Sequence, residues 1–276
     1  MKNAKYIKKY IYMTIVITVI FSVSVVFLNF RLFCMSKTIE DLQKEIIAKD
    51  TTPKKEIETI TIPEPLNKNK VGTYSLEKLK NLDLTGYDKI MISTHPDDEM
   101  FWGGGHLLED DYLVVCVTCG MDDNRLAEFK KAMTATNDKY ITLTYPRVVD
   151  PSLKREFNWE ATSYLTQDLI NILNLKDWDM IVTHNPDGEY GHKYHKLTSQ
   201  VVTSIVKDKD KLYYFEKYYK KDAAATYDGP VLKNDIYERK HKIIDETYLS
   251  QWGSVRDHKH MFNNENFVKY SDWNKA

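Results

Sequence analysis

From residue 87 onward, short apolar runs rich in β-branched residues alternate with segments whose apolar residues recur at helical spacing. Strands are predicted over 88–94, 112–118, 140–145, 179–184 and 212–215. Helices are predicted between them, over 122–137, 158–173 and 197–206. Strands that alternate with helices require crossover connections, which produce a mostly parallel sheet covered on both faces. The pattern therefore predicts a Rossmann-like α/β fold.

An uncharged apolar run over 11–28 precedes this region. As a helix it would span about 27 Å, which is close to the thickness of the hydrocarbon core of a membrane. The alternative is a cleaved signal peptide, which has a shorter apolar stretch of about 7–15 residues and a small-x-small cleavage site. No such site follows the run, and the residues before Cys34 are too large for a lipoprotein signal. We predict an uncleaved transmembrane signal anchor over 11–30.

Lysines crowd the N-terminal side of this run and not the other side. The positive-inside rule then places residues 1–10 in the cytoplasm and the rest of the chain outside the cell membrane, which it crosses once. Residues 31–70 contain a short helical pattern and then a segment rich in proline and lysine, which predicts a stalk and an extended linker. The predicted catalytic domain covers 71–276.

The charge of the chain limits the classes of partner. Lysine and arginine number 39 against 40 acidic residues, so the formal net charge is −1, and we predict no nucleic-acid partner. Cys116 and Cys119 invite a redox or metal interpretation. On a strand, however, residues three apart lie about 10 Å apart, beyond the reach of a disulfide of about 7 Å. We therefore predict two buried apolar side chains.

Two motifs follow predicted strands. HPDDE, at residues 95–99, follows the strand over 88–94, and HKYH, at residues 192–195, lies shortly after the strand over 179–184. Ligands of parallel sheets bind outside the carboxyl ends of the strands. Both motifs are therefore predicted at the edge of the sheet where a binding site is expected.

The residue types in these motifs are those of a metal site. Zinc accepts imidazole nitrogen and carboxylate oxygen, and His95, Asp98 and His195 offer both. Asp97 is then left as a base for an activated water. Each motif alone has a simpler interpretation, because acid pairs often cap helices and histidine pairs occur by chance. Their joint placement favours the metal site, and iron or cobalt would suit the same ligands.

With these motifs the chain resembles the PIG-L/LmbE family of zinc-dependent de-N-acetylases. The resemblance rests on STHPDDEMFWGGG, on GEYGHKYH, and on NRLAEFKKA, which contains Arg125 and Glu128. It rests also on ERKHKIIDETYLSQ, which ends in Ser250 and Gln251, and it spans about residues 87–252. The resemblance implies an LmbE-like fold and Zn²⁺, with another divalent metal as the alternative.

The family implies a role for each matching residue. His95, Asp98 and His195 are expected to bind zinc, and Asp97 is expected to act as general base and acid. His192 is expected to stabilise the oxyanion of the tetrahedral intermediate, a type of contact worth about 10²–10³ in turnover.

Further residues are expected to bind the substrate: Tyr190, Arg125 and Glu99. The chain departs from the family inside the second motif, where many relatives have HPDH and this chain has Lys193 and Tyr194. In those relatives the aspartate would orient or charge the histidine that corresponds to His192, and this chain lacks it.

Taken together, the resemblance and the anchor predict a membrane-anchored, extracytoplasmic, metal-dependent hydrolase. It would remove acetyl from an N-acetylated amino sugar of the N-acetylglucosamine type in a cell-surface or carrier-linked glycan. Two alternatives stay open: hydrolysis of a different amide, and a catalytically idle module that binds glycans.

Overall fold

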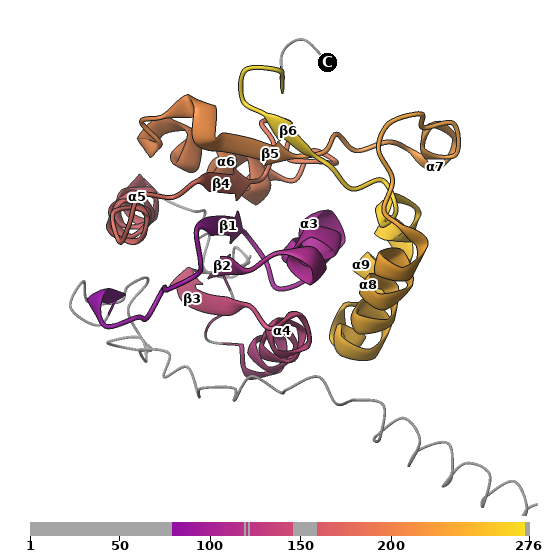
Figure 1. Ribbon diagram of the computed structural model, residues 1–276, viewed down its shortest axis with the longest axis horizontal. Helices are drawn as coiled ribbons and strands as arrows, with labels where there is room; N and C mark the ends of the chain where they lie inside the picture. The colour runs from indigo at the N-terminus through magenta and orange to yellow at the C-terminus, as the bar shows by residue number, and fades with distance from the viewer. Residues whose placement is uncertain (1–78, 119, 121, 146–158, 274–276) are drawn as a thin grey trace, which may run out of the picture. The chain divides into compact units, whose positions relative to one another are not determined.

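The computed structural model describes residues 79–118, 120, 122–145 and 159–273 (Figure 1), and these residues all belong to the unit Ile60–Ala276. The predicted anchor over 11–30, the stalk and linker, and Cys119 lie outside the described residues. Within the described ranges, no helix is long and apolar enough to cross a membrane.

A six-stranded sheet forms the centre of the described region. Its strands are β1 Lys89–Ser93, β2 Tyr112–Thr118, β3 Lys139–Tyr145, β4 Met180–Thr183, β5 Leu212–Phe215 and β6 Phe267–Lys269. The strands are ordered β3-β2-β1-β4-β5-β6, and all neighbours are parallel except β5 and β6. The predicted mostly parallel α/β sheet is confirmed.

Helices connect and cover the strands. In the described residues the α-helices are α3 Asp98–Glu109, α4 Asp123–Thr136, α5 Trp159–Leu173, α6 Lys193–Ile205, α7 Lys221–Ala224, α8 Asn234–Thr247 and α9 Trp252–His258. The same ranges contain the short 3₁₀ turns η1 Lys209–Lys211, η2 Leu249–Gln251 and η3 Lys259–Met261. The helix predicted over 197–206 begins earlier, at Lys193, so that prediction was wrong at its start. The sequence pattern predicts no helix for the segment that forms α3.

The two faces of the sheet carry separate cores. Ile90 and Ile92 of β1 pack with α5 and α6, whereas Met91 between them packs with α3, α4 and α8. This alternation follows from the period of two along a strand. Figure 1 shows α5 and α6 apart from α3, α4 and α8, with the sheet between them. The predicted helical cover on both faces is therefore confirmed.

Glycines let other parts of the chain approach α3 closely. A Cβ atom at Gly103 would lie 2.5 Å from Met91, and one at Gly105 would lie 2.4 Å from Leu232. Each interior glycine costs a helix about 1 kcal/mol of propensity relative to alanine. Because that cost is local and the packing gain is tertiary, the sequence pattern did not indicate this helix.

A buried ion pair joins α8 and the C-terminal segment to α3. Lys240 is fully buried, and its ammonium donates to the carbonyl oxygens of Phe101 and Phe262 and to Glu265, at 2.9, 2.9 and 2.6 Å. These three bonds use every donor of a lysine. Glu265 also accepts from the backbone N–H of Gly105, at 2.9 Å. The pair thus fixes the helix that carries the second half of HPDDE.

The chain order reverses between β1 and β4, which are adjacent in the sheet although β2 and β3 intervene in sequence. Open parallel sheets bind ligands at such a switch point, outside the carboxyl ends of the two strands. HPDDE follows β1, and the segment that leads to HKYH follows β4. The topology therefore brings both motifs to one place.

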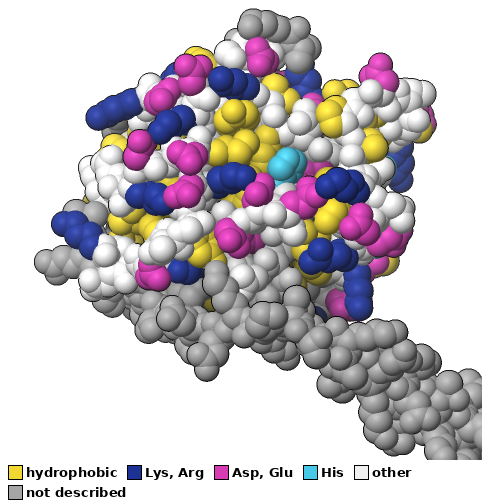
Figure 2. Space-filling model, viewed as in Figure 1, with side chains coloured by type: hydrophobic (Ala, Val, Ile, Leu, Met, Phe, Trp, Pro, Cys, Tyr) yellow, Lys and Arg dark blue, Asp and Glu magenta, His cyan; other side chains and the backbone are white. Residues whose placement is uncertain are grey.

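Acidic and basic side chains are interspersed over the face drawn in Figure 2, with hydrophobic side chains near its middle. This mixing agrees with the balanced charge of the sequence.

One buried carboxyl group lies away from the switch point, at the start of β3. Asp138 is 4% exposed, and its Oδ1 accepts the backbone N–H of Tyr112 at 2.7 Å. Burial raises the pKa of Asp138 to about 8. Between about pH 4 and 8 the folded protein therefore keeps a proton here that the unfolded chain releases, so a rise in pH favours unfolding.

We expect Asp138→Asn to remove this pH dependence. Relative to wild type, the variant should gain free energy of unfolding as pH rises from 5 to 8, by at most about 1.4 kcal/mol per pH unit. Urea unfolding across this range measures the difference. Glu238→Gln, on the exposed side of α8, is the control and should show no such trend. A constant difference between Asp138→Asn and wild type would contradict the prediction.

Candidate active site

Three donor atoms from the two motifs converge at the switch point. His95 Nδ1 lies 3.1 Å from Asp98 Oδ2 and 3.2 Å from His195 Nε2. The third side of the triangle, His195 Nε2 to Asp98 Oδ2, is 3.2 Å. In a tetrahedral zinc site with bonds of 2.0–2.1 Å, ligand atoms lie about 3.3 Å apart. The donor set therefore has the types and the spacing that a zinc ion requires.

The turn between β1 and α3 positions two of the three donors, His95 and Asp98. His95 follows β1, and Asp98 is the first residue of α3. The backbone N–H of His95 donates to Asp98 Oδ2 at 2.7 Å, and the N–H of Asp98 donates to the carbonyl of His95 at 3.2 Å. Between them Asp97 has φ 130°, a conformation that non-glycine residues rarely adopt. This sharp turn aims His95 and Asp98 at the same point.

Glu189 orients the third donor of the triangle. Its Oε2 lies 2.6 Å from His195 Nδ1 and 2.8 Å from His184 Nδ1. Burial alone would raise the pKa of Glu189, but the two imidazoles lower it to about 2. The ionised carboxylate therefore accepts both Nδ1–H groups, which turns His195 Nε2 toward Asp98. A carboxylate behind a ligating histidine is the usual support of such a ligand.

His184 offers a second way to complete a triad of donors, together with Asp98 and His195. Its Nε2, however, already accepts the backbone N–H of Thr94 at 2.9 Å, and its Nδ1 donates to Glu189. Both ring nitrogens of His184 are thus engaged. This favours His95 over His184 as the third ligand.

The carboxylates around the triad stabilise a positive charge on His195. Burial alone would lower the pKa of His195, yet Asp98 and Glu189 raise it to about 10. Burial alone would raise the pKa of Asp98, but the imidazoles of His195, His95 and His184 hold it well below its ordinary value. The pKa of His95, unlike that of His195, is lowered: burial brings it to about 3.

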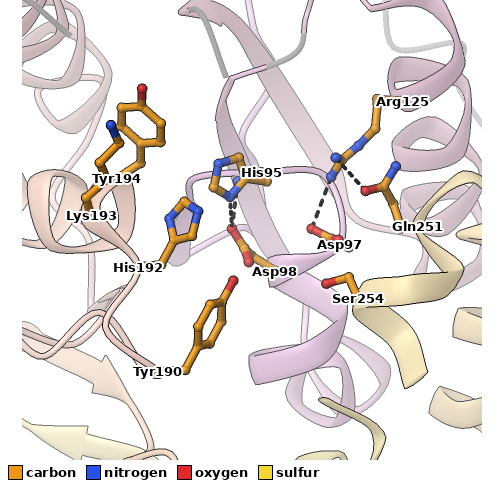
Figure 3. Close-up of a pocket in the computed structure, with 10 residues that line it drawn as sticks. All are labelled: His95, Asp97, Asp98, Arg125, Tyr190, His192, Lys193, Tyr194, Gln251 and Ser254. Carbon is orange, nitrogen blue, oxygen red and sulfur yellow. Dashed lines mark hydrogen bonds and ion pairs between the residues drawn. The ribbon is translucent and has the colours of Figure 1, made fainter. Parts of the chain in front are cut away.

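Asp97 lies beside the triad and contacts an arginine (Figure 3). Arg125 Nη2 donates to Asp97 Oδ1 at 3.2 Å and also to the carbonyl of Pro96. Burial raises the pKa of Asp97 well above its ordinary value, and the guanidinium of Arg125 opposes that rise. The contact places a buried carboxyl group near the donors without making it one of them.

His192 and Tyr190 line the other side. The ring of His192 lies 4.8 Å from that of His95 and 4.4 Å from that of His195. Burial lowers the pKa of His192 to about 4, so the ring is neutral near pH 7. Tyr190 is 42% exposed, and its hydroxyl points toward Asp98 (Figure 3). Both side chains can therefore reach a molecule bound at the triad.

These groups surround a cavity of about 390 Å³, at the lower end of the range for small-molecule sites. It is lined by His95, Asp97, Asp98, Arg125, Tyr190, His192, Lys193, Tyr194, Gln251 and Ser254.

Two predicted site residues do not line this cavity. His195 is fully buried behind it, with only its Nε2 near the other donors. Glu99 is also fully buried, and its carboxylate accepts from the hydroxyl of Tyr248 and, at 3.2 Å, from the N–H of Asp97. Glu99 therefore supports the turn at Asp97 from behind instead of facing a ligand.

Glu189 and Gln251 belong to the site although the sequence did not predict a role for either of them. Glu189 lies inside the quoted GEYGHKYH segment, and the signal that could have indicated it is an acid between two glycines near a candidate ligand. Gln251 lies in the Ser-Gln pair of the fourth quoted segment. It is far from Asp97 in sequence, so no local pattern indicates that the two residues line the same cavity.

Comparison with known proteins identifies relatives of this chain. No family model matches it. It is 31% identical over 179 residues to the uncharacterized protein L374 of Acanthamoeba polyphaga mimivirus, a match that covers 58% of this chain and 75% of that protein. The chain belongs to the same family as this viral protein.

More distant similarity reaches named enzymes. The chain is 25% identical over 162 residues to the 1D-myo-inositol 2-acetamido-2-deoxy-alpha-D-glucopyranoside deacetylase of Corynebacterium diphtheriae. The match covers 46% of this chain and 55%, about half, of that enzyme. Among solved structures, the A40926 pseudoaglycone deacetylase Dbv21 is similar, with a TM-score of 0.47 and 14% identity, over 64% of this chain and 87% of that one.

We expect Glu189→Gln to weaken binding of a divalent metal ion by about 10–100-fold. The amide carries no charge, and its NH₂ group would face either the two imidazole N–H groups or the N–H of Asn185, all of which need an acceptor. Competition with a chromophoric chelator measures the affinity. Asp187→Asn, an exposed neighbour, should leave it unchanged. Equal affinities for Glu189→Gln and wild type would show that Glu189 does not orient a metal ligand.

Proposed function

We propose that the protein is a metal-dependent hydrolase that removes acetyl from an N-acetylated amino sugar. The observation that carries the proposal is the triangle of His95, Asp98 and His195 donors, with sides of 3.1–3.2 Å. Two of its members, His95 and Asp98, line the same cavity as Asp97. Imidazole and carboxylate donors together suit zinc, and iron or cobalt as alternatives.

The triangle would hold the cation, with the cavity left open on the side away from His195. A bound cation supplies Lewis acidity, which lowers the pKa of water toward about 7 and polarises a carbonyl group. The chain's own residues supply the remaining steps. Glu189 fixes the orientation of the His195 ring, so Nε2 already points toward Asp98 before a cation binds.

Asp97 is the group that would move protons. Its side chain lines the same cavity as His95 and Asp98. It would accept a proton from the attacking water and deliver it to the nitrogen of the leaving amine. Arg125 keeps Asp97 in place through the 3.2 Å contact with Oδ1, and its guanidinium opposes the rise that burial causes in the pKa of Asp97.

His192 and Tyr190 would bind the acetyl group. The neutral ring of His192 can donate one N–H to the developing oxyanion, and the hydroxyl of Tyr190 points to the same space. Preorganised donors of this kind typically contribute about 10²–10³ in turnover. Lys193 and Tyr194, which fill the middle of HKYH, line the cavity next to His192 and would contact the substrate.

The choice of substrate class is supported by the corynebacterial relative, whose name gives a 2-acetamido-2-deoxy-glucopyranoside as its substrate. An N-acetylglucosamine-type sugar in a glycan would place its acetamido group at the donor triangle. The address is proposed from the sequence: the apolar run and its lysine flank support a cell-membrane anchor over 11–30 with the catalytic domain outside the cell.

The catalytic proposal predicts that Asp97→Asn retains bound metal and loses turnover by about 10²–10⁴-fold, because the amide cannot accept the proton. Acetate release from N-acetylglucosamine in cell-wall, teichoic and lipid-linked forms measures activity, and metal analysis measures occupancy. Asp177→Asn, which is exposed, should behave as wild type.

Complete removal of metal with a chelator should abolish acetate release, and added Zn²⁺ should restore it. Activity that survives removal would rule out the mechanism. Metal binding and glycan affinity without acetate release would indicate a binding module instead. Release of a different acyl group would change the substrate and leave the site assignment in place.

The proposed address predicts that the full-length chain fractionates with membranes and that deletion of 1–30 releases it. Protease added outside intact cells should digest the catalytic domain and spare a cytoplasmic tag placed before residue 1. Protection of the domain from the protease would contradict an extracytoplasmic location.

A further inference from the structure

Arg125 has a second polar partner besides the turn at Asp97. Its Nη1 donates to Gln251 Oε1 at 2.7 Å, while its Nη2 donates to Asp97 Oδ1 and to the carbonyl of Pro96. The guanidinium therefore bridges Asp97 and Gln251, which bind different terminal nitrogens (Figure 3). A planar guanidinium with fixed partners on two nitrogens has little freedom to rotate.

Gln251 is itself held in one orientation. Its Nε2 donates to Ser250 Oγ at 2.7 Å, and Ser250 Oγ donates to Glu128 Oε2 at 2.7 Å. Glu128 Oε1 also accepts the backbone N–H of Ser250 at 2.6 Å. Since the amide oxygen of Gln251 faces Arg125 and its nitrogen faces Ser250, each of these hydrogen bonds pairs a donor with an acceptor.

The chain of bonds begins and ends on one helix. Arg125 and Glu128 lie one turn apart on α4 and therefore face the same side, where η2 packs. The dipoles of the Gln251 amide and the Ser250 hydroxyl run from the arginine cation toward the glutamate anion. Hydrogen bonds aligned in this way strengthen one another.

We propose that Gln251 is a positioning residue for Asp97, acting through Arg125, with Glu128 and Ser250 as its support. The proposal rests on the proposed function of Asp97 as the proton-transfer group. Its physical basis is the backbone at Asp97, where φ 130° is unfavourable for a residue with a side chain and persists only if neighbours impose it. Arg125 is one of those neighbours, and Gln251 keeps it there.

Gln251 also lines the cavity, so a direct contact with substrate is the competing role. The two roles differ in what they change. A substrate contact would alter KM and would act independently of Arg125. A positioning role would alter kcat and would vanish once Arg125 is removed.

Gln251→Met, which keeps the volume and loses both hydrogen bonds, should lower kcat by about 10–100-fold with KM and metal content unchanged. Glu128→Gln should give a smaller loss of the same kind, since it keeps one acceptor for Ser250. Lys131→Met is the matched control, because it removes another contact between α4 and the end of α8, at Glu246, that does not reach Asp97. The control should keep wild-type kcat.

A double-mutant cycle decides between the two roles. In an Arg125→Met background, Gln251→Met should change kcat less than 2-fold if Gln251 acts through Arg125. An equal loss in both backgrounds, or a loss carried by KM, would overturn the proposal.

A measurement without turnover separates this proposal from the proposed function. In NMR spectra of the full-length chain, rotation of the Arg125 guanidinium about its Nε–Cζ bond should be slow, and Gln251→Met should make it fast. Slow rotation in both proteins, or fast rotation in wild type, would overturn the positioning role. A wild-type protein that releases no acetate but shows this change would overturn the proposed function alone.

Discussion

The turn between β1 and α3 is the constraint on which the site depends. It has to aim His95 and Asp98 at one point and leave Asp97 beside them, and the backbone achieves this only with φ 130° at Asp97. Such a conformation is unfavourable for a residue with a side chain. The contacts around it, from Arg125 in front and from Glu99 behind, are best understood as what holds it in place.

The same requirement explains the charges buried near α3. A helix that starts inside the site must not shift along its axis, because a displacement of about 1 Å can cost about 10² in rate. Lys240 and Glu265 bind the backbone of α3 from outside, where the glycines leave room for them. Burying this pair is expensive unless all its hydrogen bonds are made, and here each lysine donor has an acceptor.

Much of the sheet could be predicted from the sequence, because the apolar runs of β1 and β2 are continuous and alternate with clear helical stripes. The start of α6 could not be predicted, since the residues from His192 to His195 are polar and do not continue the apolar stripe of the helix. In the site, Asp97 and Asp98 were indicated by residue type and spacing. Glu99 was expected to face the substrate, and only the structure shows it turned toward Tyr248.

The sequence by itself determined the order of β1 to β5 with the helices α4, α5 and α6, and the chemistry of two short motifs, because periodicity and residue type are local properties. Only the tertiary structure decided that the motifs meet. His95 and His195 lie 100 residues apart in the chain and 3.2 Å apart in space, because β4 adds to the sheet beside β1 and not beside β3. The partners that orient the donors were decided in the same way, since a hydrogen bond such as that between Arg125 and Gln251 depends on packing between distant segments.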